Sequence, residues 1–246
     1  MCKNHFIITG TSRGIGEQLA KLLLERGDCV HGISRGNSNV LNQYKDYSYT
    51  NFDLSNITGI ETLIREILSQ MDLTSTEMIC LINNAAMLEP LKTIDKCTAE
   101  EINLHMQTTL IAPIVLTSCF INQTDHTHSR RKIINISSGS GTYPAPAMSV
   151  YCSAKAGINM FTQCVGIEQA NRQSPVEVIS VDPGMVDTNL QITARGKSDE
   201  DFEMAKYFKQ AHETGQLLTT EALGEHILHI IDKKIESGNL VKYNEH

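Results

Sequence analysis

Tyr151 and Lys155 are the residues of this sequence whose types and spacing most clearly suggest chemistry. They lie four positions apart at the start of an expected helix, so their side chains share one helix face. A free phenol, with a pKa of about 10, exchanges protons poorly at neutral pH, and a neighbouring ammonium favours the phenolate and lowers that pKa. The pair could therefore exchange a proton with a substrate. Alone, the same spacing would also suit two unreactive residues on a helix.

Ser138 adds a hydroxyl group to this pair. It lies thirteen residues before Tyr151, just after an expected strand at 132–137. A hydroxyl there could hydrogen-bond the same substrate oxygen as Tyr151 and stabilise charge where it forms. Ser137 is the alternative for this role; if Ser138 has it, Ser137 is the last residue of the strand.

The composition excludes several classes of protein. The 246 residues are 41% hydrophobic and 20% charged, which is typical of a globular protein, and the net charge is −7. Because acidic and basic residues are interspersed, the electrostatic footprint of a nucleic-acid binder is missing. The densest basic run, 130–132, is expected to be the solvated entrance of a strand. His126 and His128 have no further ligand cluster beside them, so no metal site is expected.

Cysteine spacing and apolar runs bear on the location of the protein. The seven cysteines are scattered without a C-x-x-C pair, which suggests a reducing compartment. An expected strand at 5–8 leaves no room for a signal peptide, and the longest apolar stretch, 110–121, is too short to cross a bilayer. We therefore expect a cytoplasmic protein with no membrane and no nucleic-acid partner.

Short β-branched runs alternate with longer segments of helical period, which is typical of βαβ units and a parallel sheet. Strands are expected at 5–8, 29–34, 47–52, 78–83, 132–137, 176–181 and 240–243. Helices are expected at 14–26, 57–70, 99–120, 150–169 and 222–236. The pattern predicts one seven-stranded parallel sheet within a single domain, residues 1–246.

The segment 187–216 is long and polar, with a helix expected only at 201–212. Loops of such length inside a compact domain are usually functional or mobile. We expect a flap that covers the substrate, with a plain surface excursion as the alternative.

A glycine-rich turn follows the first expected strand. Gly10, Gly14 and Gly16 stand in the run TGTSRGIG, residues 9–16, directly before the first expected helix. Glycines permit a tight turn and let the backbone approach a pyrophosphate, while the helix N-terminus offers unpaired N–H groups to the phosphates. Its place between a strand and a helix makes this run a predicted dinucleotide site.

The end of the second expected strand indicates which dinucleotide binds. For NAD, an acidic residue is expected there to accept hydrogen bonds from the ribose hydroxyls. The sequence has Ser34 and Arg35 instead, and a guanidinium can pair with a 2′-phosphate. Arg13 in the glycine turn could approach the same group. NADP(H) is therefore the predicted cofactor, unless both arginines are merely solvated surface residues.

Together these motifs resemble the short-chain dehydrogenase/reductase family. The glycine spacing, the run NNAA at 83–86, the tyrosine and lysine, and a Pro-Gly pair at 183–184 follow the family's order over nearly the whole chain. The resemblance implies a single-domain Rossmann-type three-layer αβα fold and an NADP-dependent oxidoreductase acting on CH–OH or C=O groups. The implied cofactor contacts are Gly10, Ser12, Arg13, Gly14, Ile15, Gly16, Ser34, Arg35, Asp53, Leu54, Asn83, Ala85, Tyr151, Lys155, Pro183, Gly184, Val186 and Thr188.

The resemblance also implies roles for the catalytic residues. Tyr151 would protonate the oxygen of a small-molecule carbonyl substrate as hydride reaches its carbon, Ser138 would hold that oxygen, and Lys155 would also bind the nicotinamide ribose. Two positions depart from the family pattern. Thr109 stands where the family often has an Asn whose backbone carbonyl holds a water of the proton relay, and threonine retains a carbonyl. Ala86 replaces a glycine and adds a methyl group near the cofactor.

Within the family, residues 82–87, 151–157 and 182–188 are most similar to bacterial sepiapterin-reductase-like enzymes and to the benzil reductases that form (S)-benzoin. This similarity implies reduction of one carbonyl of a vicinal diketone such as benzil. Substrate contacts are expected from Ser138, Tyr143 and Met185. Other pocket candidates, apolar enough for an aryl ketone, are Gly139, Met148, Leu190 and Ile192.

Alternative functions stay open. The chain could be a sepiapterin or pteridine-type reductase, or a nonenzymatic NADP-sensing protein, although such a sensor would be expected to lose Tyr151 or Lys155. A reductase of fatty-acid elongation would need a basic patch for an acyl-carrier protein, and none is evident. The family resemblance further implies a homodimer or a homotetramer.

Overall fold

Seven parallel strands form one sheet in the order β3-β2-β1-β4-β5-β6-β7. The computed structural model describes residues 3–198, 200 and 202–243. The strands are β1 (Asn4–Thr9), β2 (Cys29–Ser34), β3 (Tyr47–Asn51), β4 (Met78–Asn83), β5 (Arg130–Ile136), β6 (Glu177–Asp182) and β7 (Leu240–Lys242). The predicted seven-stranded parallel sheet is confirmed, as is the Rossmann-type order of its strands.

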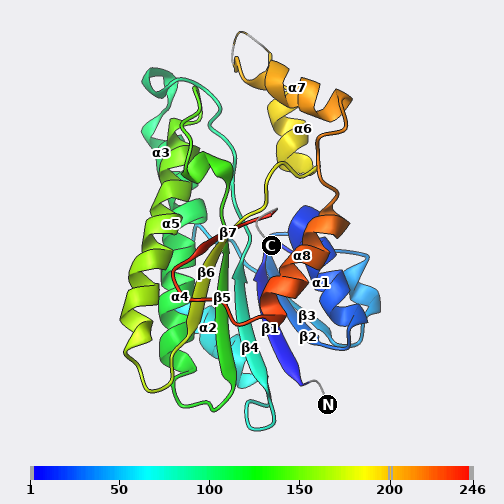
Figure 1. Cartoon of the computed structure of the whole chain (residues 1–246), viewed down its shortest axis with the longest axis vertical. Helices are drawn as coiled ribbons and strands as arrows, with labels where there is room; N and C mark the ends of the chain where they lie inside the picture. The colour runs from blue at the N-terminus through cyan, green and yellow to red at the C-terminus, as the bar shows by residue number, and fades with distance from the viewer. Residues whose placement is uncertain (1–2, 199, 201, 244–246) are drawn as a thin grey trace.

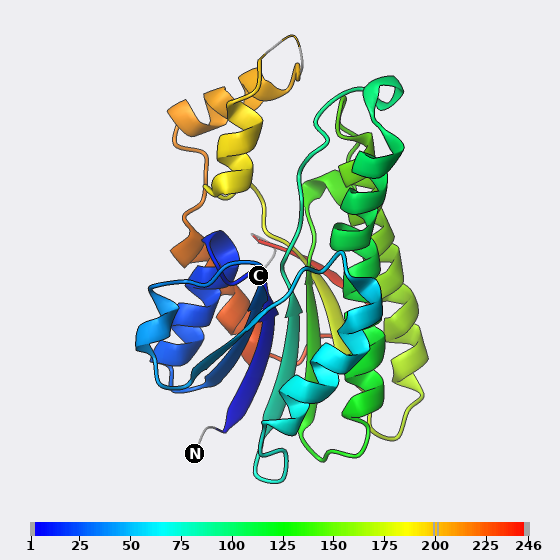
Figure 2. The same ribbon diagram turned by 180° about the vertical axis from the view of Figure 1, so that it is seen from behind.

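Helices cover both faces of the sheet (Figures 1 and 2). α1 (Gly14–Glu25) and α8 (Thr220–Asp232) pack together on one face, over a core that includes Phe6, Leu19 and Ile227. α2 (Ile60–Ser69), α4 (Ala112–Gln123) and α5 (Ser149–Ala170) cover the other face. Every residue of β4 is buried, as expected for a central parallel strand with helices on both sides. This arrangement confirms the three-layer αβα prediction.

The order of the strands determines where a ligand can bind. β1 is paired on one side with β2 and on the other with β4, so the connections from β1 and β4 leave the sheet in opposite directions. In open parallel sheets, a crevice opens at such a switch point, outside the carboxyl ends of the strands. The glycine turn after β1 and the asparagines after β4 therefore face one another at this edge.

The segment 99–123 is interrupted, where the sequence predicted one unbroken helix to residue 120. It consists of α3 (Ala99–Met106), a π-helical turn (Gln107–Ile111) and α4. Pro113 has no N–H and cannot donate the α-helical hydrogen bond to the carbonyl of Thr109. The Thr109 hydroxyl accepts a hydrogen bond from Met87 N at 3.1 Å, which ties the widened turn to the loop after β4.

The same segment, Ala99–Gln123, is the one helix among the described residues that is long and apolar enough to cross a membrane by length and composition. The sequence analysis had judged its apolar stretch too short. Ala112, Leu116 and Phe120 of this segment are fully buried in the core against the sheet. Burial of this kind is what a core helix of a globular domain requires.

The predicted flap contains two helices, α6 (Asn189–Arg195) and α7 (Ala205–Glu213), which lie beyond the carboxyl edge of the sheet (Figure 1). α6 was not predicted. The helix predicted at 201–212 begins at Ala205 in the structure, and position 201 lies outside the described residues. The two ends of the segment are joined by backbone hydrogen bonds from Asp187 N to Leu218 O and from Leu218 N to Met185 O.

The remaining elements of the described residues are short 3-10 turns. The turns are Leu41–Gln43, Ile57–Gly59, Ile94–Lys96 and Gly139–Gly141.

Cys29, at the start of β2, is disulfide-bonded, which the scattered spacing of the cysteines did not predict. The free cysteines among the described residues are Cys80, Cys97, Cys119, Cys152 and Cys164.

The basic run 130–132 begins β5, as predicted for a strand entrance, but the prediction that it is solvated was wrong for Arg131 and Lys132, which are buried. Lys132 is completely buried, and its ammonium group caps the C-terminal end of α8. Its Nζ donates hydrogen bonds to the carbonyls of Ile230 and Lys233, each at 2.7 Å. It also pairs with Glu177 at 2.8 Å. A buried cation at a helix C-terminus balances the carbonyl groups that the helix leaves unpaired.

We expect Lys132→Met to lower the free energy of unfolding by about 3 kcal/mol, since it leaves the carbonyls at the end of α8 without their donor and leaves the largely buried Glu177 carboxylate with Arg130 as its remaining ion-pair partner. Urea denaturation followed by circular dichroism measures this loss. The double variant Lys132→Met/Glu177→Gln should recover part of it, because the charge of the carboxylate is removed. A single variant as stable as the wild type would contradict the assigned role.

Candidate active site

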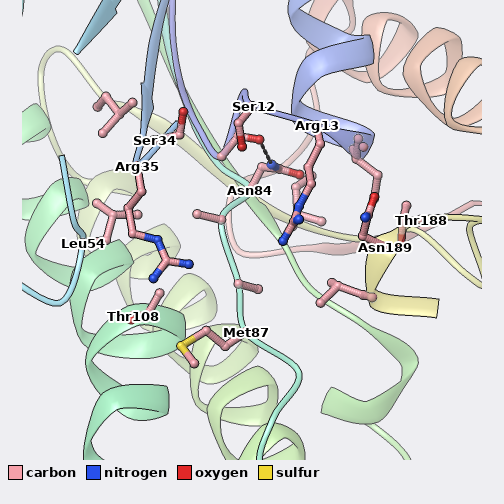
Figure 3. A pocket seen from close by; sticks show the side chains of 18 of the residues that line it. Ser12, Arg13, Ser34, Arg35, Leu54, Asn84, Met87, Thr108, Thr188 and Asn189 are labelled. Carbon is pink, nitrogen blue, oxygen red and sulfur yellow. Dashed lines mark hydrogen bonds between the residues drawn. The ribbon is translucent and has the colours of Figure 1, made fainter. Parts of the chain in front are cut away.

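A cleft of about 460 Å³ opens at the carboxyl ends of the strands, where the topology places it. It begins at the glycine turn and at the ends of β2 and β3, passes the loop after β4 and reaches the start of α5 and the flap (Figure 3). The predicted site residues that line this cleft are Gly10, Ser12, Arg13, Gly14, Ile15, Ser34, Arg35, Asp53, Leu54, Ala85, Tyr151, Lys155, Pro183 and Thr188.

The glycine turn has the backbone that only glycine adopts readily. Gly10 and Gly14 have φ of 77° and 65°, in the left-handed region. Gly16 has a different role. A Cβ atom there would lie 2.3 Å from the Gly10 carbonyl oxygen and 2.5 Å from Asn84 Nδ2, so Gly16 lets α1 pack against the turn. It does not line the cleft, although the sequence analysis placed it among the cofactor contacts.

Thr9 and Asn84, which the sequence analysis did not select, hold this turn in place. The Thr9 hydroxyl accepts hydrogen bonds from Asn84 N and Ala85 N, both at 3.0 Å. Asn84 Nδ2 donates in return to Thr9 O at 2.9 Å and to Gly10 O at 3.3 Å. Polar residues at the carboxyl ends of two neighbouring parallel strands were the available signal. These bonds fix the loop after β4 against the glycine turn.

Asn83, a predicted cofactor contact, points into the protein instead. Its Nδ2 donates to Asn135 Oδ1 at 2.8 Å and to the Thr117 hydroxyl at 3.3 Å, which joins β4 to β5 and α4. Gly184, Val186 and Met185 also lie outside the residues that line the cleft. Their segment nevertheless follows Pro183, which does line it.

The end of the cleft beside β2 is basic. The side chains of Arg13 and Arg35 extend into it from the glycine turn and from the end of β2 (Figure 3). Ser34 lines the same end, and its hydroxyl donates to Gly36 O at 2.7 Å. The pKa of Asp53 is lowered mainly by the hydrogen bond from the Ser55 backbone, with a further contribution from the positive charge of Arg35. Two guanidinium groups beside a glycine-rich turn give this end of the cleft a positive charge that suits a phosphate group.

The other end of the cleft contains two of the three predicted catalytic residues, Tyr151 and Lys155; Ser138 is not among the residues that line it, whereas Ser137 is. Tyr151 and Lys155 occupy the first two turns of α5, and both line the cleft, although their exposed fractions are only 7% and 3%. Lys155 Nζ donates to Ile136 O at 2.7 Å and lies 5.7 Å from the centroid of the Tyr151 ring. The hydrogen bond ties α5 to the end of β5 and thereby places Tyr151 beside the residues that follow the strand.

The hydroxyl partners distinguish the two serines. Ser137 Oγ donates to Asn159 Oδ1 at 2.6 Å and is buried in this contact. Ser138 Oγ accepts a hydrogen bond from Ser140 N, and a hydrogen bond between Ser138 and the Tyr151 side chain lowers the pKa of that phenol. Ser138 is therefore the serine whose side chain hydrogen-bonds the phenol.

Burial controls the protonation of the pair. It raises the pKa of Tyr151 to about 12, against the smaller lowering by Ser138, and the carboxylate of Asp182 raises it further. Burial also lowers the pKa of Lys155 to about 8. The sequence analysis predicted that the ammonium would lower the phenol pKa, but in the structure desolvation dominates and raises it. Tyr151 is a protonated phenol at neutral pH, which suits it to act as an acid.

An apolar cluster, defined here by Leu88, Leu91, Met148, Tyr151, Ala194, Phe202 and Ala205, surrounds the phenol ring. All seven side chains are buried. Ala194, Phe202 and Ala205 come from the flap. An ion pair between Lys197 Nζ and Glu89 Oε1, at 2.6 Å, joins the flap to the loop that carries Leu88 and Leu91. Of the predicted pocket residues, this cluster contains only Met148.

The other substrate predictions have different outcomes. Tyr143 is 64% exposed and Ile192 is 52% exposed, so neither packs against the phenol in this structure. Leu190 lines the cleft. Gly139 follows Ser138 and begins the 3-10 turn that packs on α5.

A buried, protonated phenol hydrogen-bonded to a serine, beside a cleft that begins at a glycine-rich turn, suits an oxidoreductase that pairs hydride transfer with proton transfer. The sequence comparison gives the family. The model of the short-chain dehydrogenases matches residues 4–199, and the chain belongs to the short-chain dehydrogenase/reductase family, whose members use NAD(P)H.

Individual relatives cover almost the whole chain. Benzil reductase ((S)-benzoin forming) from Bacillus cereus is 36% identical over 98% of this chain and 99% of its own length. Sepiapterin reductase from Bos taurus is 27% identical over 94% of this chain and 91% of its own length. A short-chain dehydrogenase/reductase from Saccharomyces cerevisiae superimposes with a TM-score of 0.82 at 21% identity, over 98% of this chain and 96% of that one.

We expect the stability of the wild type relative to Lys155→Met to depend on pH, because the variant removes a buried ammonium group whose pKa is lowered in the folded protein. In the unfolded chain lysine keeps its ordinary pKa of 10.5, so between pH 8 and 10.5 the unfolded state binds more protons and the wild type gains stability as pH rises. The free energy of unfolding of the wild type should therefore rise by about 3 kcal/mol relative to that of the variant over this window.

Urea denaturation at pH 7 and pH 10.5 measures the change. Lys45→Met is the matched control, because the Lys45 side chain is 90% exposed and its difference from wild type should stay constant. The same constancy for Lys155→Met would show that the lysine is not desolvated in the folded protein.

Proposed function

We propose that the protein is an NADPH-dependent carbonyl reductase that reduces a ketone with apolar substituents. The single observation that carries this proposal is the position of Tyr151. The phenol lines the cleft that suits the dinucleotide, and the same ring lies within the apolar cluster. One residue therefore contacts both the space for the cofactor and the space for the substrate.

The preference for NADPH is argued from charge. A carboxylate at the end of β2 would repel a 2′-phosphate, whereas this chain has Ser34 and Arg35 there, with Arg13 across the cleft. A guanidinium can form two charge-assisted hydrogen bonds with a phosphate, each stronger than a bond between neutral groups. The additional phosphate of NADPH would thus be bound where NADH has a hydroxyl.

The chemistry follows from the protonation of the site. The bound cofactor supplies a hydride to the carbonyl carbon. Tyr151, protonated because it is buried, gives its proton to the carbonyl oxygen as negative charge develops there. Ser138 donates a hydrogen bond to the same oxygen, and Lys155 stabilises the phenolate that forms. The Lys155 pKa of about 8 lies near pH 7 and well below that of the phenol, so the ammonium can give a proton to the Tyr151 phenolate.

The substrate class is argued from the apolar cluster. Aliphatic and aromatic side chains surround the phenol, so the groups on either side of the carbonyl should be apolar or aromatic. The B. cereus relative is a benzil reductase, and one carbonyl of a vicinal diketone such as benzil is accordingly the proposed target. A pteridine would bring many hydrogen-bonding groups into this cluster, which offers them few partners.

We expect the wild type to oxidise NADPH with benzil or another diketone faster than with sepiapterin or simple aldehydes. Tyr151→Phe should lose at least about a hundredfold in kcat, because it lacks the proton donor, while binding NADPH as tightly as the wild type. Steady-state absorbance at 340 nm, with fluorescence titration for binding, measures both. NADPH binding without reduction of any carbonyl would favour the nonenzymatic NADP-sensing alternative, and a preference for sepiapterin would favour the pteridine reductase.

We expect Arg35→Ala to weaken NADPH binding by about tenfold or more and NADH binding by less than about twofold, since only NADPH has the phosphate. Fluorescence titration with both nucleotides gives the two dissociation constants. Lys45→Ala is the control for a general loss of surface charge. Equal weakening of both nucleotides by Arg35→Ala would refute the argument for NADPH.

A homodimer or homotetramer and a cytoplasmic location stay predictions. Both were inferred from the sequence, the first from family resemblance and the second from composition. Size-exclusion chromatography with light scattering, and localisation of a tagged chain, would address them separately.

A further inference from the structure

Asn159 is a buried asparagine of α5 that the proposed reaction does not use. It lies four residues after Lys155 and eight after Tyr151, so the three side chains belong to one stripe of the helix surface. Asn159 is only 8% exposed. A carboxamide both donates and accepts hydrogen bonds, and a buried one is expected to use both functions. The partners of Asn159 therefore indicate what it holds in place.

The hydrogen bonds of Asn159 reach both ends of the segment 137–141, called the serine loop here. Nδ2 lies 3.5 Å from the carbonyl oxygen of Gly141, and because a carbonyl oxygen can only accept, this nitrogen is the donor. Oδ1 then accepts a hydrogen bond from the Ser137 hydroxyl at 2.6 Å. The shorter distance makes the contact with Ser137 the stronger of the two.

The far end of the serine loop also packs directly on α5. A Cβ atom at Gly141 would lie 2.7 Å from Asn159 Nδ2 and 2.9 Å from the Lys155 carbonyl oxygen, so this position has no room for a side chain. The 3-10 turn Gly139–Gly141 is thus in close contact with the helix that carries the phenol.

Ser138 lies between these two ends of the serine loop. Its neighbour Ser137 is bound to Asn159 through its hydroxyl. On the other side, Gly141 N donates to the carbonyl oxygen of Ser138 at 2.9 Å. The position of the Ser138 hydroxyl, which hydrogen-bonds the Tyr151 phenol, therefore depends on both contacts of Asn159.

The contact with Asn159 also distinguishes the two serine hydroxyls. Ser137 lines the cleft, so its hydroxyl could compete with that of Ser138 for a substrate oxygen. A serine hydroxyl has one proton, and Ser137 donates it to Asn159 Oδ1. The Ser138 oxygen accepts a hydrogen bond from Ser140 N, which leaves the proton of its own hydroxyl free to be donated.

We propose that Asn159 is a positioning residue for proton transfer. By binding the Ser137 hydroxyl and the Gly141 carbonyl, it holds the Ser138 hydroxyl against the oxygen of Tyr151. This inference rests on the proposed carbonyl reductase function and adds to it a residue that is not among those lining the cleft.

A double-mutant cycle with Ser138 tests the proposal, because a residue that acts through Ser138 has nothing to position once that hydroxyl is removed. The measurement is the single-turnover rate of NADPH oxidation by benzil, followed at 340 nm. Ser138→Ala should lower this rate by about a hundredfold. Asn159→Leu, which keeps a branched side chain but removes both polar groups, should lower it by about tenfold.

The decisive comparison is made without the Ser138 hydroxyl. In the Ser138→Ala background, Asn159→Leu should lower the rate further by less than about twofold. The dissociation constant of NADPH should stay within about twofold of the wild type in Asn159→Leu, since Asn159 acts on the proton donor and not on the nucleotide. Fluorescence titration measures this constant.

Ser137→Ala breaks the same hydrogen bond from the loop side, and it keeps the proposal testable if Asn159→Leu does not fold. It should lower the single-turnover rate by about threefold or more in the wild type and by less than about twofold in the Ser138→Ala background.

Thr162→Val is the matched control on the same helix. Thr162 is completely buried and accepts hydrogen bonds from Asn135 at 2.9 Å and Ser180 at 2.8 Å, which join α5 to β5 and β6. Within the described part of the chain, none of its hydrogen bonds goes to the serine loop. Thr162→Val should therefore leave the rate within about twofold of the wild type.

The outcomes separate the two claims. An unchanged rate in Asn159→Leu, or an equal loss with and without the Ser138 hydroxyl, overturns the positioning role. A loss in Thr162→Val as large as that in Asn159→Leu overturns it as well, because any buried hydrogen bond of α5 would then have the same effect. If the wild type oxidises NADPH with no ketone or diketone, the carbonyl reductase function fails, and this inference fails with it.

Discussion

The hydrogen bond from Lys155 to the carbonyl of Ile136 is the contact on which the arrangement of the site depends. It joins the second turn of α5 to the last residue of β5, and so sets the distance between the helix that carries the phenol and the loop that carries Ser138. The lysine is almost completely buried, and an isolated ammonium in such a place is costly unless it is hydrogen-bonded. The same burial that lowers its pKa keeps Tyr151 protonated. The buried contact between α5 and β5 therefore determines both the position of Tyr151 and the protonation of the pair.

Much of the fold could be predicted because it depends on local patterns. Alternation of β-branched runs with helical segments is enough to predict the seven strands and their parallel arrangement. The glycine-rich run TGTSRGIG between a strand and a helix is enough to predict a dinucleotide site. The cleft residues near the cofactor were predictable for a related reason. In a parallel sheet the carboxyl ends of the strands meet at one edge, so Gly10, Arg35 and Ala85 are brought together by topology alone.

The errors arose where the environment of a residue, rather than its type, decides its role. Lys132 has the composition of a surface residue, and only the tertiary packing of α8 over β5 explains its burial. Leu88, Tyr151 and Phe202 come from three segments with no regular spacing between them, and no periodicity connects them. The phenol pKa was misjudged for the same reason, since desolvation is a property of the assembled cluster.

The burial of Phe202 has a consequence for how fast the site can be entered. Tyr151 lines the cleft, but the side of its ring that belongs to the apolar cluster is covered by the protein's own side chains, so a substrate group that enters the cluster displaces the flap. The ion pair of Lys197 with Glu89 is partly exposed and holds the flap weakly, but exposing Phe202 costs roughly 2–3 kcal/mol. At that cost only about one molecule in a hundred is open at any moment. Capture of substrate from solution is then limited by a conformational equilibrium, and the apparent association rate falls by that same fraction.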